Sequence, residues 1–146
     1  MEITKIFTFD AAHHLTDYHG KCEHVHGHTY KLEITVEGPV QSNGLVLDFT
    51  ILKNIVKNNI LDKVDHFDLN TILKNPSSEN LVIWMWEQIS PFQEKVLEES
   101  SNPNLPESLK GYLEDTNNLD VKVNQVSLKE IKLWETGSSC LIYKGN

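Results

Sequence analysis

The sequence predicts an α+β domain in which two helices cover one face of a four-stranded antiparallel sheet, in the order β-β-α-α-β-β. Strand-like segments lie near both ends of the chain, and segments with helical spacing lie between them. One segment, TYKLEITVEG, alternates apolar and polar residues, as expected of a strand with one face on a core. The length of 146 residues fits a single domain, 1–146, that buries a core without disulfides.

The first two strands are predicted at residues 3–9 and 29–38. ITKIFTF, at 3–9, is rich in β-branched and aromatic residues. Within 29–38 one parity is apolar: Tyr30, Leu32, Ile34 and Val36. The other parity is polar: Lys31, Glu33, Thr35 and Glu37. We expect the apolar face to meet the helices and the polar face to meet water or a polar lumen.

Two segments in the middle of the chain have helical spacing. TILKNIVKNNIL, residues 50–61, follows Asp48 and Thr50, either of which suits the N-cap. NPSSENLVIWMWEQI, residues 75–89, begins with a Pro-Ser-Ser start signal, and Pro91 is expected to end or kink it. The predicted buried positions are Leu52, Ile55, Val56 and Ile60 in the first helix and Leu81, Val82, Met85, Trp86 and Ile89 in the second.

The rest of the chain contains a polar excursion and two more strands. Residues 98–120 are rich in Asn, Ser and Pro, which predicts a surface segment with a short helix around SLKGYL and no chemistry of its own. Residues 121–134 and 139–144 are strand-like, and ETGSS between them predicts a hairpin turn.

The charge balance and the N-terminus exclude several classes of protein. With 13 basic and 21 acidic residues the net charge is −8, and without a basic run a general nucleic-acid binder is excluded. The start, MEITKIFTFD, is no export signal, and no apolar run approaches the roughly eighteen residues that a membrane span needs. We therefore expect a cytoplasmic protein.

The two cysteines differ in their surroundings. A reduced cytoplasm predicts that Cys22 and Cys140 are not joined. Cys140, inside CLIY, is predicted to be a small buried hydrophobic residue. Cys22 lies in a polar loop among histidines, where a metal or an imidazolium would favour the thiolate, so it is a candidate for chemistry.

The histidines are strongly clustered. Six of the seven lie within sixteen positions: His13, His14, His19, His24, His26 and His28. Imidazole is the commonest protein ligand of zinc and similar metals. If the second strand begins early, His26 and His28 share the parity of Tyr30 and project to one side, which forms half of a zinc site. His19 and His24 are interpreted as bystanders.

A third ligand is expected from AAHHL at the end of the first strand. His13 or His14 could supply it, because paired antiparallel strands bring such ends together. The seventh histidine, His66, follows Asp65 in VDHFDLN. From the residues alone, Asp65 could be a helix cap and His66 a solvated turn residue. Because consecutive residues in an extended chain point apart, we do not expect the two to form a hydrogen bond.

Several interpretations of this cluster remain open. Three histidines leave one position of a tetrahedral zinc open, as in catalytic sites. Alternatively, Cys22 closes a structural His₃Cys site, or Glu135 acts as the base of a zinc hydrolase. The coordination of the metal distinguishes these hypotheses. Trp84, Met85 and Trp86 are interpreted as core or interface residues.

Together these segments resemble the 6-pyruvoyl-tetrahydropterin synthase / 6-carboxy-tetrahydropterin synthase family. The resemblance runs in order over about residues 7–90 and 126–143, and 91–125 resembles nothing specific. Its parts are FTFDAAHHL for the first zinc-ligand segment, CEHVHGH for the cysteine and HGH pair, VDHFDLN for the Asp-His segment, NPSSENLVIWMW for the start of the second helix, and WETGSSCLIY for the glutamate hairpin.

The resemblance implies a fold, a cofactor and an assembly. The family has the tunnelling fold, in which three subunits close their sheets into a barrel and two trimers stack, so self-association is expected. The polar sheet face would line that barrel. The cofactor would be Zn²⁺, held by His13, His26 and His28, while His14 occupies a place often held by arginine, which would weaken an anion contact.

The resemblance also implies catalytic and substrate-binding residues. Cys22 matches the family's catalytic acid/base, and Asp65 and His66 match its partner pair. Glu135 matches the acidic residue that anchors the pterin ring or completes the proton relay. A carboxylate suits the guanidine-like edge of a pterin, because two oxygens face paired N–H donors.

The spacing within CEHVHGH resembles one branch of the family. Three residues separate Cys22 from the HGH pair, as in the 6-carboxy-tetrahydropterin synthases of 7-deazaguanine (queuosine) biosynthesis. The implied reaction converts 7,8-dihydroneopterin triphosphate to 6-carboxy-tetrahydropterin, acetaldehyde and triphosphate. The alternative is a 6-pyruvoyl-tetrahydropterin synthase, which eliminates triphosphate without cleaving the side chain.

Overall fold

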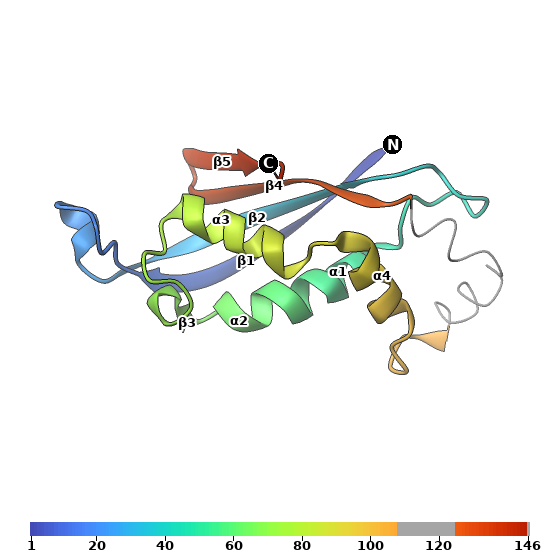
Figure 1. Cartoon of the computed structure of the whole chain (residues 1–146), viewed down its shortest axis with the longest axis horizontal. Helices are drawn as coiled ribbons and strands as arrows, with labels where there is room; N and C mark the ends of the chain where they lie inside the picture. The colour runs from blue at the N-terminus through green and yellow to red at the C-terminus, as the bar shows by residue number, and fades with distance from the viewer. Residues whose placement is uncertain (108–124, 146) are drawn as a thin grey trace.

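The computed structural model of the chain describes residues 1–107 and 125–145, which form a sheet covered by helices on one face (Figure 1). The strand order is β3-β1-β2-β4-β5. The four long strands are antiparallel, which confirms the predicted α+β class. A fifth strand, the two-residue β3 (Phe67–Asp68), adds a short parallel pairing to β1 that was not predicted.

The first two strands are longer than predicted. β1 (Glu2–His13) and β2 (His26–Glu37) pair along their whole length, and His13 lies opposite His26 at one end. The apolar parity of β2 is fully buried, as the alternation predicted. The same register continues into the HGH segment, because antiparallel pairing with β1 supplies partners that the local sequence does not reveal.

The last two strands form the predicted hairpin. β4 (Ser127–Thr136) pairs with β2, and β5 (Ser139–Tyr143) forms the edge of the sheet. The register shifts between Trp134 and Thr136, which marks a β-bulge beside the turn. Residues 125 and 126 precede the start of β4, and positions 121–124 of the predicted strand lie outside the described residues, as does SLKGYL.

The first predicted helix is one continuous helical segment. It runs from α1 (Phe49–Val56) through a π-helical stretch (Lys57–Leu61) to α2 (Asp62–Val64). Asp48, rather than Thr50, is the N-cap, and its carboxylate accepts a hydrogen bond from the Thr50 amide at 2.6 Å.

The second predicted helix is α3 (Ser78–Gln88), with Ser77 as its N-cap. α3 ends three residues before Pro91, as expected, and a further helix, α4 (Phe92–Ser100), begins directly after that proline. The sequence did not predict α4, because its inner side is only partly apolar: it buries Phe92, Val96 and the carboxylate of Glu99.

Glu99 ties α4 to α1. Its carboxylate accepts hydrogen bonds from the side-chain amides of Asn54 at 2.7 Å and Asn102 at 3.2 Å. These amide donors compensate the burial of the charge.

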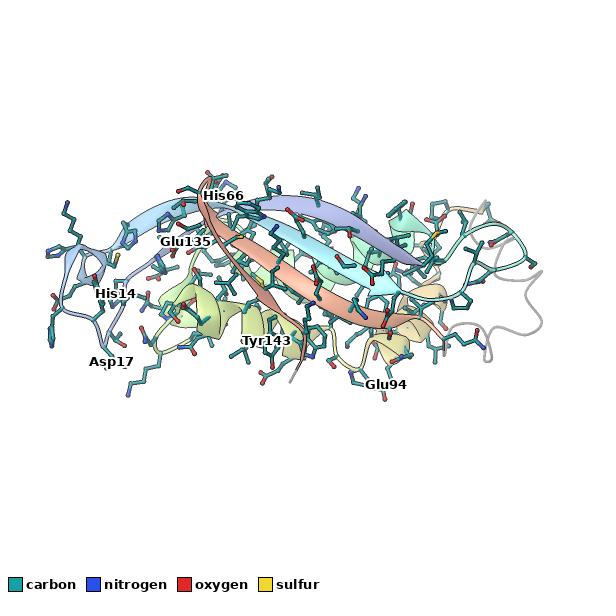
Figure 2. The ribbon with its side chains drawn as sticks, turned by 90° about the horizontal axis from the view of Figure 1, so that it is seen from above. His14, Asp17, His66, Glu94, Glu135 and Tyr143 are labelled. Carbon is teal, nitrogen blue, oxygen red and sulfur yellow. The ribbon has the colours of Figure 1, made fainter. Side chains whose placement is uncertain are left out.

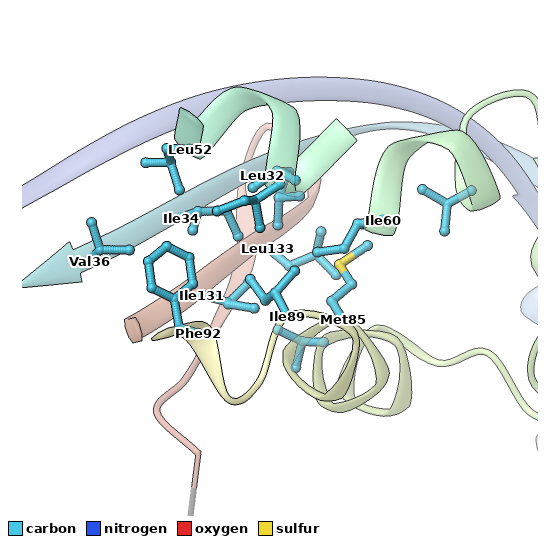
Figure 3. Packing of buried hydrophobic residues seen from close by; sticks show 14 of the residues in the cluster. Leu32, Ile34, Val36, Leu52, Ile60, Met85, Ile89, Phe92, Ile131 and Leu133 are labelled. Carbon is cyan, nitrogen blue, oxygen red and sulfur yellow. The ribbon is translucent and has the colours of Figure 1, made fainter. Parts of the chain in front are cut away.

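The core lies between the sheet and the helices (Figure 3). The predicted inner positions of α1 and α3 are buried, with Trp84 and Trp86 only partly so. Core residues from the sheet and the helices include Leu32, Ile34, Leu52, Ile60, Met85, Ile89, Phe92, Ile131 and Leu133. Within residues 1–107 and 125–145 no helix combines the length and apolar character that a membrane span requires.

Candidate metal centre and adjoining pocket

Three histidines converge where β1 ends and β2 begins. His13 lies opposite His26, and Ala11 lies opposite His28, so the three imidazoles share the helix-facing side of the sheet. One ring nitrogen from each histidine lies within 4.8 Å of the other two. The register therefore selects His13 over His14, a choice that the sequence pattern left open. His13 is almost fully buried, at 1% exposure.

Two backbone carbonyls set the tautomers of this cluster. His13 Nδ1 lies 2.8 Å from the Pro76 oxygen, and His26 Nδ1 lies 2.8 Å from the His24 oxygen. A carbonyl only accepts, so each Nδ1 must carry the proton, and in the neutral ring each Nε2 then presents a lone pair. The two Nε2 atoms are 3.2 Å apart. Two lone pairs at this distance repel each other, and a cation bound between them would remove that repulsion.

His28 adds a third available nitrogen. Its Nε2 is buried and has no hydrogen-bond partner. Burial lowers the pKa of His28, and the neighbouring His13 and His26 lower it further, although Glu135 acts in the opposite direction. His28 is thus held neutral, which is the form that binds a metal.

These donors fit a borderline divalent metal such as zinc. Three neutral imidazoles are a common ligand set for zinc, and Cys22 is not among the described residues whose ligand atoms gather here. Glu135 lies near, because its Oε1 is 3.6 Å from His13 Nε2 and 3.8 Å from His28 Nε2. The arrangement is an open three-histidine centre with a carboxylate beside it.

A pocket of about 320 Å³ adjoins the centre. It lies between the loop 14–25, the start of α3 and the β4–β5 hairpin, and both Cys22 and Glu135 line it together with His13. Figure 2 shows that His14, His66 and Glu135 gather at the same end of the molecule, far from Glu94.

The bulge in β4 places Glu135. Trp134 pairs with Cys140 and Thr136 pairs with Ser139, so Glu135 is the residue without a partner in the ladder. A bulge of this kind redirects a side chain. The Glu135 side chain is only 32% exposed and is directed towards the histidines.

The side chains of Asp65 and His66 lie at ion-pair distance, although no hydrogen bond joins these two described residues, as expected. His66 Nδ1 lies 2.9 Å from Asp65 Oδ1, because His66 has a positive φ of 65° that turns its ring back. Both residues are also bound to Asp10. The His66 amide donates to the Asp10 carbonyl at 2.6 Å, and the Asp10 amide donates to Asp65 Oδ1 at 3.0 Å.

Within one chain the predicted catalytic residues do not all meet in one pocket. His66 is 76% exposed and lines a separate, open groove of about 520 Å³, whose wall also contains His28. Cys22 and Glu135 line the pocket beside His13. The metal centre therefore lies between the two hollows.

Cys140 is exposed, which corrects the prediction of a buried residue. It lies opposite Trp134 on β5, the edge strand, and it also lines the pocket that contains Cys22. CLIY looks apolar in sequence, but the helices cover only one face of the sheet, so alternate residues of β5 are exposed. Both cysteines are free.

Sequence reasoning missed two further residues of this site. Ser78 lines the pocket, is 7% exposed, and its hydroxyl is buried without a hydrogen-bond partner. The hydroxyl of Tyr30 is likewise buried and unpaired, and the Tyr30 ring lies edge-on to His28. An unpaired buried hydroxyl costs about 1–3 kcal/mol. Ser78 looked like a helix cap in sequence, and Tyr30 looked like an ordinary strand residue.

Comparisons with known proteins point to one family, whose members carry different activity names. The model of a family described as 6-pyruvoyl tetrahydropterin synthase matches residues 2–102. A Haemophilus influenzae protein named 6-carboxy-5,6,7,8-tetrahydropterin synthase is 32% identical over 147 residues, covering 98% of both chains. A Pyrococcus furiosus protein named dihydroneopterin monophosphate aldolase is 42% identical over 82 residues, covering 56% of this chain and 68% of its own.

Comparison with solved structures indicates the same family fold. The solved structure of Caenorhabditis elegans 6-pyruvoyl tetrahydropterin synthase superimposes with a TM-score of 0.67 at 25% identity. The superposition covers 100% of this chain and 96% of that one.

Proposed function

Because the chain belongs to the 6-pyruvoyl tetrahydropterin synthase family, we propose that it is a zinc-dependent 6-carboxy-5,6,7,8-tetrahydropterin synthase. The substrate is 7,8-dihydroneopterin triphosphate, and the products are 6-carboxy-tetrahydropterin, acetaldehyde and triphosphate, as in 7-deazaguanine (queuosine) biosynthesis. The observation that carries the proposal is the open three-histidine centre, whose His13 lines one pocket together with Cys22 and Glu135. The near full-length similarity to the Haemophilus influenzae protein supports it.

The histidines would hold zinc through their Nε2 atoms. His13 and His26 are oriented by the carbonyls of Pro76 and His24, and His28 is oriented by its strand. Bound zinc would supply Lewis acidity towards oxygen atoms of the substrate side chain.

Proton transfer falls to groups beside the centre. Cys22 Sγ is a partly exposed thiol in the pocket and would give and take protons at the side chain. Asp65 Oδ1 lies 2.9 Å from His66 Nδ1, so the carboxylate would stabilise a protonated His66 ring that exchanges its proton through Nε2. His66 would take part in the same reaction if, in an assembly, the open groove that it lines lay next to the Cys22 pocket of another subunit.

The pocket also suits a pterin ring. The Glu135 carboxylate can accept two parallel N–H donors from the guanidine-like edge of the ring. Ser78 lines the same pocket, and its buried, unpaired hydroxyl would gain a partner if a ring heteroatom came within reach.

We expect Glu135→Gln to keep zinc and the melting temperature but to lower kcat/KM by about ten- to hundredfold. The amide offers one acceptor instead of two, and it removes a charge-assisted hydrogen bond, which is worth about 1.5–3 kcal/mol. Steady-state kinetics and metal analysis would measure both effects. The matched control is Glu130→Gln on the same strand, where the carboxylate pairs with Lys144. Unaltered kinetics of Glu135→Gln would remove this residue from the site.

Self-association is part of the proposal, as a trimer or a dimer of trimers. β3 covers the outer edge of β1 only at Ala11 and Ala12, and β5 forms the opposite edge of the sheet. Exposed strand edges are stable when another chain pairs with them. Large apolar side chains are exposed near these edges: Ile6, Phe49, Phe67 and Ile142.

Light scattering at micromolar concentration is expected to give the mass of three or six chains. Ile142→Asp, which places a charge on the outer strand, is expected to shift the population to smaller species while the helical content stays the same. A wild-type protein that is monomeric under these conditions would contradict the proposed assembly.

The products of one incubation test the proposed reaction. Zinc-loaded protein is incubated with 7,8-dihydroneopterin triphosphate, and the products are identified by mass. Acetaldehyde together with a carboxy-pterin supports the proposal. A pyruvoyl-pterin would favour the activity named for the Caenorhabditis elegans protein, and aldol cleavage would favour that named for the Pyrococcus furiosus protein. No turnover would contradict both the carboxy- and the pyruvoyl-pterin synthase activities.

A further inference from the structure

We infer that Asn70 and Asn75 are positioning residues that fix the place of Cys22 relative to the three-histidine centre. The inference rests on the proposed role of Cys22 in proton transfer. Neither asparagine lines the pocket, and both act through the backbone of residues 14–16. A series of hydrogen bonds joins the α2–α3 connection to the loop that carries Cys22.

Asn70 extends the short parallel pairing of β3 with β1. That pairing ends at Ala12, opposite Asp68, where the chain turns into a 3₁₀ turn (Leu69–Thr71). The side chain of Asn70 then takes the place of a strand: its Oδ1 accepts from the His14 amide at 2.9 Å, and its Nδ2 donates to the His14 carbonyl at 3.0 Å. A side-chain amide can do this because it carries the same donor and acceptor as a peptide group.

Asn75 holds the chain two residues further on. Its Oδ1 accepts from the Thr16 amide at 3.2 Å. Asn75 is itself anchored to the start of α3, because its carbonyl accepts from the Asn80 side chain at 2.9 Å and from the Ser77 amide at 3.0 Å. The next residue, Pro76, orients the ring of His13.

Leu15 lies between the two held residues and transmits their position to Cys22. The Leu15 amide donates to the Cys22 carbonyl at 2.9 Å. The loop 14–25 projects from the end of the sheet (Figure 1), and its other backbone hydrogen bonds, from Glu23 to Gly20 and from His24 to Lys21, are local. The direction of the Leu15 amide, and with it the place of Cys22, therefore depends on the two asparagines.

The two asparagines use different atoms, which gives a matched test. Asn75 uses only its oxygen, so Asn75→Asp keeps the acceptor that Thr16 needs. Asn70 uses both oxygen and nitrogen, so Asn70→Asp keeps one bond but sets a carboxylate against the His14 carbonyl. The two substitutions are nearly isosteric and add the same charge, yet the inference predicts opposite results. Asn75→Ala removes the acceptor altogether.

Kinetics and thiol reactivity provide two independent measurements. We expect Asn70→Asp and Asn75→Ala to lower kcat by about ten- to hundredfold, the loss that a displacement of roughly 1 Å can cause, with little change in KM and full zinc content. Zinc should stay, because the partner of His13 Nδ1 is a backbone carbonyl. Asn75→Asp should retain the wild-type kcat.

The second measurement is the rate at which iodoacetamide alkylates Cys22, relative to Cys140 in the same molecule, followed by peptide mass. We expect this ratio to change several-fold in Asn70→Asp and Asn75→Ala and to stay constant in Asn75→Asp. Equal ratios and equal kcat in all variants would overturn the inference, as would a loss of kcat that only follows a loss of zinc. If the wild-type protein does not turn over dihydroneopterin triphosphate, the proposed function fails, while the alkylation ratios still decide the positioning role.

Discussion

His26→Ala is expected to lose both the bound metal and all measurable turnover. The Nε2 of His26 lies 3.2 Å from that of His13, so its removal leaves two ligands and an open side to the centre. Disturbing an outer partner of a metal ligand already costs ten- to about a hundredfold in affinity, and the loss of a ligand itself should exceed that. Metal analysis after dialysis and a turnover assay would measure the two effects.

The matched control is His24→Ala. The side chain of His24 is exposed, and its contribution to the centre is its backbone carbonyl, which alanine keeps. We expect this variant to retain zinc and activity. A His26→Ala protein that keeps both would show that the metal is held elsewhere.

Cys22→Ala is expected to keep near-stoichiometric zinc and the wild-type melting temperature but to lose turnover by roughly two to four orders of magnitude. That is the usual contribution of a positioned acid or base. Cys22 lies in the pocket wall, and its sulfur is not in the ligand cluster, so the metal loses nothing essential.

Cys140→Ala is the comparison, because Cys140 is the other thiol in the wall of that pocket. We expect it to leave turnover nearly unchanged. If Cys22→Ala lost zinc to the same extent as His26→Ala, a closed His₃Cys structural site would be favoured and the assignment of Cys22 to catalysis would be wrong.

The sequence predicted those parts of the fold that have a long and regular pattern. The alternation of 29–38 and the inner positions of α1 and α3 matched the structure, because each pattern reflects one buried face. β3 has two residues and α4 buries a carboxylate, so neither carries such a pattern. Both depend on partners that are distant in sequence.

In the candidate site, too, local sequence patterns predicted some features, and contacts between distant residues decided the others. Clustering of histidines indicated a metal, but the choice between His13 and His14 required the register of β1 against β2. The contact of Asp65 with His66 required a positive φ that L-residues seldom adopt. Asn70 and Asn75 act on the backbone of a loop more than fifty positions away, which no local pattern reveals.

X-ray absorption at the zinc edge of the wild-type protein tests the central claim most directly. An open three-histidine centre predicts a first shell made only of nitrogen and oxygen, at about 2.0–2.1 Å, with the imidazole scattering of three histidines. The same spectrum is expected from Cys22→Ala. A sulfur atom in the first shell at about 2.3 Å, absent from Cys22→Ala, would contradict the account and make Cys22 a ligand of a closed site.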